Sequence, residues 1–220
     1  MNKELKKRII TSVFLLSLFV FMFFYSFILI TGLIIISIIS WIEFYGLISK
    51  IFTRKKFRNK ILKFTYKSIS LMYLFFLVSF ILVIEANNPE LKIFIIYSIL
   101  VSILSDVGGL IIGRYFKGKK LTKISPKKTV SGSIGAFIFS LSLIPFFIED
   151  FTNQDFFSLF IITLIISFAS QIGDLFISFL KRKAKVKNTS DLLPGHGGIL
   201  DRIDGMIFAI PTGFFLLNYL

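Results

Sequence analysis

The sequence predicts an all-α, polytopic membrane protein of about seven transmembrane helices with its N-terminus in the cytoplasm. Hydrophobic residues make up 55% of the 220 positions, and the mean hydropathy is +0.83, which is far too apolar for a soluble domain. Cysteine is absent, which excludes disulfides and thiolate metal sites. The basic start and first apolar run lack a small-residue cleavage site, so we expect a retained span and not a signal peptide.

Residues 9–41 form the first apolar segment and hold no charge over 33 positions. At about 1.5 Å per residue this would be roughly 50 Å of helix, whereas one crossing needs about 20 residues. We therefore predict a break near Tyr25-Ser26 and a tight helical hairpin. The further predicted spans are 68–84, 91–112, 133–148, 156–180 and 203–220. We expect one compact membrane domain, in which helices of residues 1–90 precede a catalytic region at 91–220.

Charge asymmetry predicts the orientation. Of the 26 Lys and Arg residues, 25 fall within residues 3–8, 50–67, 114–128 and 181–202. The other loops carry acidic residues, namely Glu85, Glu90, Glu149, Asp150 and Asp155. Seven spans place all four basic groups in the cytoplasm, as the positive-inside rule requires. Topology thus explains the net charge of +14, and no recognition motif supports nucleic-acid binding. The basic loops would also attract anionic membrane lipids.

Two aspartates lie inside predicted spans, where each costs about 3 kcal/mol or more. Asp106 shares a helix face with small residues, and Asp174 does so in a later span. These companions are Ser98, Ser102, Ser105, Gly109 and Gly113 for the first, and Ser167, Ser170, Gln171 and Ser178 for the second. Close helix packing explains the serines and glycines. The aspartates favour a polar cavity between the helices. Two roles remain open for Glu43: it lies at the membrane interface without a function, or it belongs to the functional site.

The loop after the fourth span is rich in phosphate-binding side chains. Lysines supply point charges, Arg114 a bidentate fork, and Ser125 and Thr129 hydroxyl donors. The lysines that we single out are Lys127 and Lys128. An alternative is that Ser125-Pro126 caps the next helix.

The segment 178–204 contains the most specific pattern in the chain. A basic cluster leads into Pro194-Gly195-His196-Gly197-Gly198, and two carboxylates, Asp201 and Asp204, flank Arg202. Three glycines, the only histidine and paired carboxylates at a membrane boundary have no packing reason. They suit a phosphorylated ligand together with a divalent cation.

This segment resembles the signature of the phosphatidate cytidylyltransferase (CDP-diglyceride synthase) family. The matching residues are Ser178, Lys181, Arg182, Lys187, Pro194, Gly195, His196, Gly197, Gly198, Asp201, Arg202 and Asp204. The resemblance extends upstream to Gly173-Asp174-Leu175, to residues 125–129, and to Asp106 with Gly113-Arg114. Two positions depart from the family pattern: Asn188 replaces an Asp, and Ser131 stands where Glu is common.

The resemblance implies that CTP and phosphatidic acid react to give CDP-diacylglycerol and pyrophosphate. Asp174 and Asp201 would bind Mg²⁺, and a second cation such as K⁺ is left open. Phosphate-binding residues would be Lys181, Arg182, Arg202 and the 125–129 loop. Further substrate contacts are expected from Arg114, Gly197, Gly198, Asp204, Ser178 and Asp106. His196 would donate to a phosphate or the leaving group, or else brace the glycine turn.

The resemblance also implies a multi-pass protein of the cell membrane whose active site faces the cytoplasm; a homodimer is left open. Related alternatives are a CTP-dependent polyprenol or phytol kinase and an archaeal-lipid cytidylyltransferase. The glycine-rich signature argues against the kinases. An alternative of another class is a cation transporter that uses Asp106 and Asp174 as midplane ligands. Against this class, the most distinctive residues lie in cytoplasmic loops.

Overall fold

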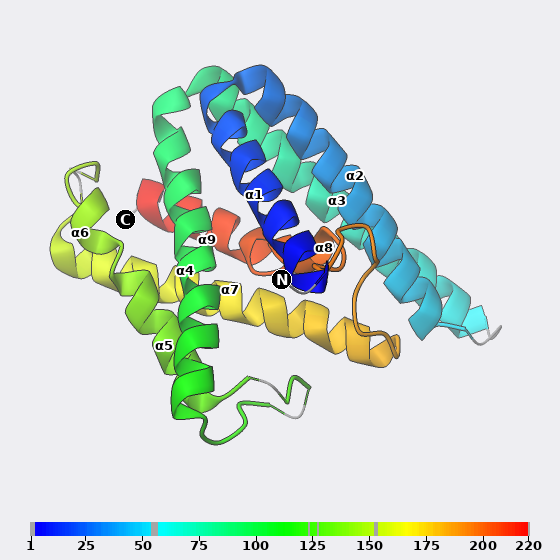
Figure 1. Ribbon diagram of the computed structural model, residues 1–220. Helices are drawn as coiled ribbons and strands as arrows, with labels where there is room; N and C mark the ends of the chain where they lie inside the picture. Colours follow the sequence, from blue (N-terminus) through cyan, green and yellow to red (C-terminus); the bar gives the residue numbers. More distant parts are fainter. Residues whose placement is uncertain (1–2, 54–56, 123, 127, 152–153, 220) are drawn as a thin grey trace. The chain divides into compact units, whose positions relative to one another are not determined.

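A computed structural model describes residues 3–53, 57–122, 124–126, 128–151 and 154–219 (Figure 1). Within these ranges the chain is helical, with no strand beyond two isolated bridges. Five helical segments are long and apolar enough to cross a membrane: Ser26–Ile51, Phe57–Asn87, Pro89–Phe116, Val130–Phe147 and Phe156–Lys183. The all-α, multi-span prediction is confirmed at this level.

The chain forms two compact units that are interleaved in sequence. The first unit holds Met1–Asn87 and Leu180–Ile203, and the second holds Asn88–Phe179 and Asp204–Leu220. Residues 184–203, which we call the signature loop, therefore group with the N-terminal helices. The predicted division between residues 90 and 91 had assigned them to the C-terminal region. That division into domains stays a prediction.

Three long helices dominate the first unit: α1 (Lys3–Phe24), α2 (Ser26–Ile51) and α3 (Phe57–Asn87). Tyr25 has an extended backbone and separates α1 from α2, which confirms the predicted break. The two helices contact each other, and α2 also packs against α3 (Figure 1). The apolar part of α1, Ile9–Phe24, is shorter than the five long segments. The short helix α8 (Leu200–Ile203) packs against α2 and brings the end of the signature loop to it.

The second unit is built on α4 (Lys92–Phe116), which follows a 3₁₀ turn, η1 (Pro89–Leu91). Its other helices are α5 (Val130–Leu141), α6 (Ile144–Phe147), α7 (Phe156–Lys183, as far as Phe179) and α9 (Met206–Tyr219). Gly108 and Gly135 let α4 and α5 approach closely, because a Cβ on either would overlap the other helix. Their contact makes α4 and α5 a closely packed pair within this unit.

Buried serines connect the helices of the second unit. Ser102 and Ser170 hydroxyls lie 2.8 Å apart, and Ser167 donates to Ser105 at 3.1 Å. Ser140 of α5 donates to Ser167 at 3.1 Å. Close packing with hydrogen bonds between helices accounts for these serines. This agrees with the interpretation that the serines and glycines on these helix faces serve helix packing. The polar cavity expected around the aspartates stays a prediction.

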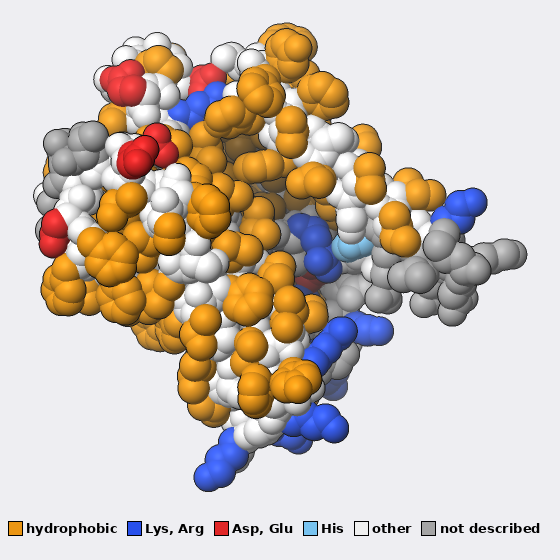
Figure 2. All heavy atoms as spheres, turned by 60° about the vertical axis from the view of Figure 1, so that its left-hand side comes forward, with side chains coloured by type: hydrophobic (Ala, Val, Ile, Leu, Met, Phe, Trp, Pro, Cys, Tyr) orange, Lys and Arg blue, Asp and Glu red, His pale blue; other side chains and the backbone are white. Residues whose placement is uncertain are grey.

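Hydrophobic side chains cover most of the face shown in Figure 2. Exposed large apolar residues occur along every long helix, for example Phe27, Phe75 and Phe168. A soluble protein rarely exposes so much contiguous apolar surface, whereas a lipid environment solvates it.

Candidate active site

The signature loop begins where α7 ends. Lys185 adopts a left-handed backbone (φ 56°), and its N–H reaches Arg182 O at 3.1 Å. The N–H of Val186 reaches Lys181 O at 3.0 Å, which completes a Schellman-type helix end. The glycine turn closes when Leu193 N–H donates to Gly197 O at 2.8 Å. The loop is therefore folded at both ends.

Asp201 is the hydrogen-bonding hub of this loop. Its Oδ1 accepts Lys181 Nζ at 2.6 Å. Its Oδ2 accepts Thr189 N–H at 2.9 Å, Thr189 Oγ1 at 2.9 Å and Gly198 N–H at 3.0 Å. Each carboxylate oxygen has two lone-pair sites, so Oδ2 is fully engaged, whereas Oδ1 keeps one site beside Lys181. Burial on its own would raise the pKa of the Asp201 carboxyl, but the Lys181 ammonium and the backbone N–H groups of Thr189 and Gly198 outweigh burial and lower it.

Glu43 of α2 holds the same loop from the other side. Its carboxylate is buried, with 6% of the residue's surface exposed. Ser190 Oγ donates to it at 2.6 Å. The Thr189 hydroxyl lies 2.8 Å from Glu43 Oε2 and 2.9 Å from Asp201 Oδ2, so its one hydrogen is shared between the two carboxylates. The N–H groups of Ile199 and Leu200, at the start of α8, donate at 3.1 and 2.8 Å. A buried carboxylate needs such donors, because its burial without them costs several kcal/mol.

Two adjacent glycines make this arrangement sterically feasible. Gly197 has φ +85°, and a Cβ there would lie 2.8 Å from Asp201 Oδ2. A Cβ on Gly198 would overlap both carboxylate oxygens of Glu43. The loop backbone must approach two carboxylates at once, which only glycine permits at these positions.

Helix α1 and Arg202 brace the turn. Thr11 Oγ1 donates to Pro194 O at 3.1 Å, and the Ser12 hydroxyl lies 3.2 Å from His196 Nε2. Arg202 Nε and Nη2 donate to His196 O at 3.2 and 2.8 Å. His196 Nδ1 is buried and has no hydrogen-bond partner among the described residues. These contacts fit the bracing role of His196; donation to a phosphate stays a prediction.

A second carboxylate cluster lies on α7 within the second unit. Asp174 Oδ2 forms an ion pair with Lys128 Nζ, and Asp174 Oδ1 accepts Ser178 Oγ at 3.2 Å. Both acidic partners of the predicted cation are thus placed, but in different units: Asp174 in the second and Asp201 in the first. No group of three His, Cys, Asp or Glu side chains arranged to hold a metal occurs among the described residues.

The loop before α5 is ordered by its own backbone. Leu121 N–H donates to Lys128 O at 2.8 Å, and Val130 N–H to Lys119 O at 3.0 Å. Thr129 caps α5, because its Oγ1 accepts Gly132 N–H at 3.1 Å. The alternative in which Ser125-Pro126 caps this helix is therefore wrong: the helix begins four residues later, where a hydroxyl can reach the free N–H groups. Lys127 lies outside the described residues.

The remaining predicted residues are spread over both units. Arg182 is exposed in the first unit. In the second, Asp106 and Arg114 are exposed on α4, and Asp204 is buried, with Oδ1 accepting Gly205 N–H at 3.0 Å. Ser131, one of the departures from the family pattern, donates to Lys117 O at 2.5 Å and so fixes the loop after α4. The sequence left the role of Glu43 open and did not single out Thr189, although both hold the loop. An acid in a long apolar stretch was the only local signal for Glu43.

The fold defines a multi-pass membrane protein with a polar loop folded around buried carboxylates. The pattern that describes the cytidylyltransferase family matches residues 4–220, and the chain belongs to that family. It is 40% identical over 142 residues to a phosphatidate cytidylyltransferase of Rickettsia typhi, which covers 61% of each chain. Similar relatives with the same name occur in Rickettsia felis (45% over 119 residues; 50% of this chain, 52% of the relative) and Staphylococcus haemolyticus (44% over 130 residues; 58% and 48%). The chain spans about half to three fifths of the length of these relatives.

Proposed function

We propose that the chain transfers the cytidylyl group of CTP to phosphatidic acid, giving CDP-diacylglycerol and pyrophosphate. The observation that carries this proposal is the loop 184–203, whose glycine turn and basic residues are held in one conformation by Asp201 and Glu43. The names of the similar relatives support the substrates. A phosphatidate oxygen attacks the α-phosphorus of CTP, and the bond from that phosphorus to the β-phosphate oxygen breaks as pyrophosphate leaves.

The chemical problem is to bring two polyanions together, because a phosphatidate oxygen is already an anionic nucleophile. No strong general base is required. Catalysis then rests on positioning and on stabilising the charge of the departing pyrophosphate. Lys181 and Arg182 at the end of α7 and Arg202 supply positive charge for the phosphates in the first unit. In the second unit, Lys128 supplies positive charge and Thr129 a hydroxyl. Arg202 has one guanidinium edge on His196 O and keeps other N–H donors for a phosphate.

Mg²⁺ is the cation that this chemistry favours, and Asp174 fits it better than Asp201 does. The Asp174 oxygens accept one lysine and one hydroxyl, which leaves lone pairs for a metal. Asp201 Oδ2 is fully engaged and Oδ1 accepts Lys181, so Asp201 would offer a cation only the remaining lone pair of Oδ1, next to the Lys181 ammonium. Mg²⁺ commonly uses one or two protein carboxylates and takes its other ligands from water and phosphate. Its role would be to offset charge on the triphosphate.

We further propose seven crossings of the cell membrane, with the N-terminus and the loop 184–203 in the cytoplasm. The five long apolar helices, together with Ile9–Phe24 and α9, would make up the seven. The proposal is supported by the clustering of 25 of 26 Lys and Arg residues in the four predicted cytoplasmic segments. CTP is made in the cytoplasm, so this orientation gives the loop access to its substrate.

The test is CTP-dependent pyrophosphate release by the detergent-solubilised protein, with and without phosphatidic acid and Mg²⁺, and with the lipid product identified by mass spectrometry. We expect release only when all three are present, and CDP-diacylglycerol as the product. A lipid kinase would instead release CDP and form a phosphorylated lipid. Absence of any CTP turnover while cation flux occurs in vesicles would favour the transporter class.

A further inference from the structure

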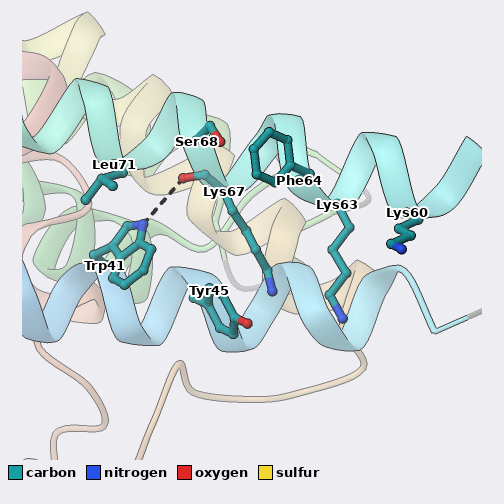
Figure 3. Close-up of a pocket in the computed structure, with 8 residues that line it drawn as sticks. All are labelled: Trp41, Tyr45, Lys60, Lys63, Phe64, Lys67, Ser68 and Leu71. Atoms are coloured by element: carbon teal, nitrogen blue, oxygen red, sulfur yellow. Dashed lines mark hydrogen bonds between the residues drawn. The ribbon is translucent and has the colours of Figure 1, made fainter.

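A cavity of about 430 Å³ lies between α2 and α3 in the first unit (Figure 3). Three of its lining residues are lysines of α3, Lys60, Lys63 and Lys67. Their spacing of three and four residues puts them on one helix face. Among the residues that the structure describes, no acidic side chain lines the cavity. The cavity therefore concentrates positive charge without a carboxylate of its own.

The opposite wall is aromatic and apolar. Trp41 and Tyr45 lie one turn apart on α2 and form this wall. On α3, Leu71 adds an apolar side chain one turn beyond Lys67. Figure 3 shows Lys63 and Lys67 extending from α3 toward α2. The Lys67 ammonium lies 3.0 Å from the centroid of the Tyr45 ring, and Trp41 Nε1 donates to Lys67 O at 3.4 Å. A cation–π contact fixes Lys67 but does not neutralise it.

The positive charge of this cavity is not balanced within the part of the chain that the structure describes. Two ion pairs among the described residues join Lys128 to Asp174 and Lys181 to Asp201, and neither involves a lysine of the cavity. Three ammonium groups on adjacent turns repel one another, so an anion placed among them would lower the free energy of the folded state. The missing partner is thus an anion.

We propose that this cavity binds the phosphate head group of an anionic membrane phospholipid. The lysines would surround the phosphate, and the glycerol and first acyl carbons would lie along Trp41 and Leu71. Both helices are long and apolar enough to span a membrane, and Trp, Tyr and Lys side chains together are typical of the level of lipid head groups. A soluble phosphate would leave the apolar wall unused. The site is separate from the loop 184–203 and does not depend on the proposed reaction.

Trp41 is the only tryptophan of the chain, so its fluorescence reports on this cavity alone. The protein would be reconstituted into phosphatidylcholine vesicles with a minor fraction of phosphatidylglycerol, one of the two lipids carrying brominated acyl chains that quench tryptophan on contact. We expect brominated phosphatidylglycerol to quench more strongly than brominated phosphatidylcholine at equal mole fraction. An attraction of about 1 kcal/mol per lysine corresponds to roughly fivefold enrichment of phosphatidylglycerol beside Trp41 for each lysine that contacts the lipid.

The variant Lys60→Gln/Lys63→Gln/Lys67→Gln should lose this preference and show equal quenching by the two lipids. The matched control, Lys117→Gln/Lys119→Gln/Lys120→Gln, removes the same charge from exposed lysines of the second unit and should keep it. Should the triple variant fail to fold, Lys63→Gln alone should give a graded loss. Equal quenching of the wild type by both lipids would overturn the proposal, as would a preference that survives in the triple variant. Displacement by soluble glycerol phosphate at the lipid's concentration would overturn the assignment to a lipid.

Discussion

Asp201 and Asp174 each bind a lysine ammonium, yet the two carboxylates differ in everything else that they touch. Asp201 accepts four donors that join the end of α7, the middle of the loop and the glycine turn. Within the described part of the chain, Asp174 accepts Lys128 and the hydroxyl of Ser178, one helical turn away. The difference shows that a carboxylate of the family motif, here Asp201, can stabilise the conformation of the loop that contains it. The Asp174 carboxylate keeps lone pairs that a ligand could use. Asp201 and Glu43, in contrast, accept hydrogen bonds from backbone N–H groups of the loop and of α8.

The largest effect on stability is expected from Glu43→Ala. This change leaves the Ile199 and Leu200 N–H groups and the Ser190 hydroxyl without the acceptor they have in the wild type, which should cost about 3–5 kcal/mol. Thermal unfolding in detergent and protease cleavage within residues 184–203 would measure the loss. The control is Glu90→Gln, an exposed acid at η1 that should change neither. A Glu43→Ala protein with wild-type unfolding and protease resistance would show that the loop folds without this carboxylate.

Asp201→Asn should destabilise the substrate-free protein by about 2–3 kcal/mol, because the amide cannot accept all four donors and its NH₂ group faces Lys181. The loop should become accessible to protease, and turnover should fall with it. Restoring resistance by adding CTP and Mg²⁺ would contradict this reading, since it would mean that Asp201 acts mainly on the bound ligand.

Asp174→Asn is the counterpart in the second unit and should leave stability within about 1 kcal/mol of wild type, since only a partly exposed ion pair and one hydroxyl contact change. Turnover should nevertheless drop by about 100-fold or more, because the variant would lose the carboxylate that we propose as a ligand of Mg²⁺. The assay is pyrophosphate release at saturating Mg²⁺. Near-normal turnover would remove Asp174 from the metal site and leave it a structural partner of Lys128.

The lowered pKa of Asp201 predicts that the stability of the folded protein depends on pH, and Asp174→Asn should not alter this dependence. A carboxylate whose pKa is lower in the folded state stabilises the protein at pH values above about 4, the ordinary Asp value. This stabilisation is lost as the pH falls through the folded-state pKa. The difference in melting temperature between wild type and Asp201→Asn should therefore shrink below about pH 4. A constant difference down to pH 2 would argue that ionisation of Asp201 does not stabilise the loop.

The smallest effect is expected from Asn188→Asp, which restores the family's residue next to Thr189. One added charge about 5 Å from a divalent ion is worth several kcal/mol at an effective dielectric of 20, and water and salt reduce this strongly. The Mg²⁺ concentration for half-maximal turnover should shift by about a few-fold. An unchanged Mg²⁺ titration would place position 188 outside the working site.

Local sequence patterns predicted the helices well, but not the contacts that hold the loop. The length of the apolar stretch alone required a break, and Tyr25 provides it. The alternative in which Ser125-Pro126 caps the next helix was wrong, because a backbone-bonded loop extends to Thr129, a feature without hydropathy signal. Glu43 could not be assigned, since its donors lie 146 to 157 positions away in the chain. Helical periodicity carries no information at that separation.

The reach of Glu43 across the chain has a consequence for biosynthesis. At about 5–20 residues per second, a ribosome needs roughly 10–30 s to make the 157 residues that separate Glu43 from Leu200. During this interval α2 has left the ribosome while its carboxylate still lacks every one of its eventual donors. An uncompensated charge is expensive within lipid, so this end of the nascent helix must wait at a hydrated boundary until residues 189–200 have been made. The loop thus matures well after α2 has been synthesised.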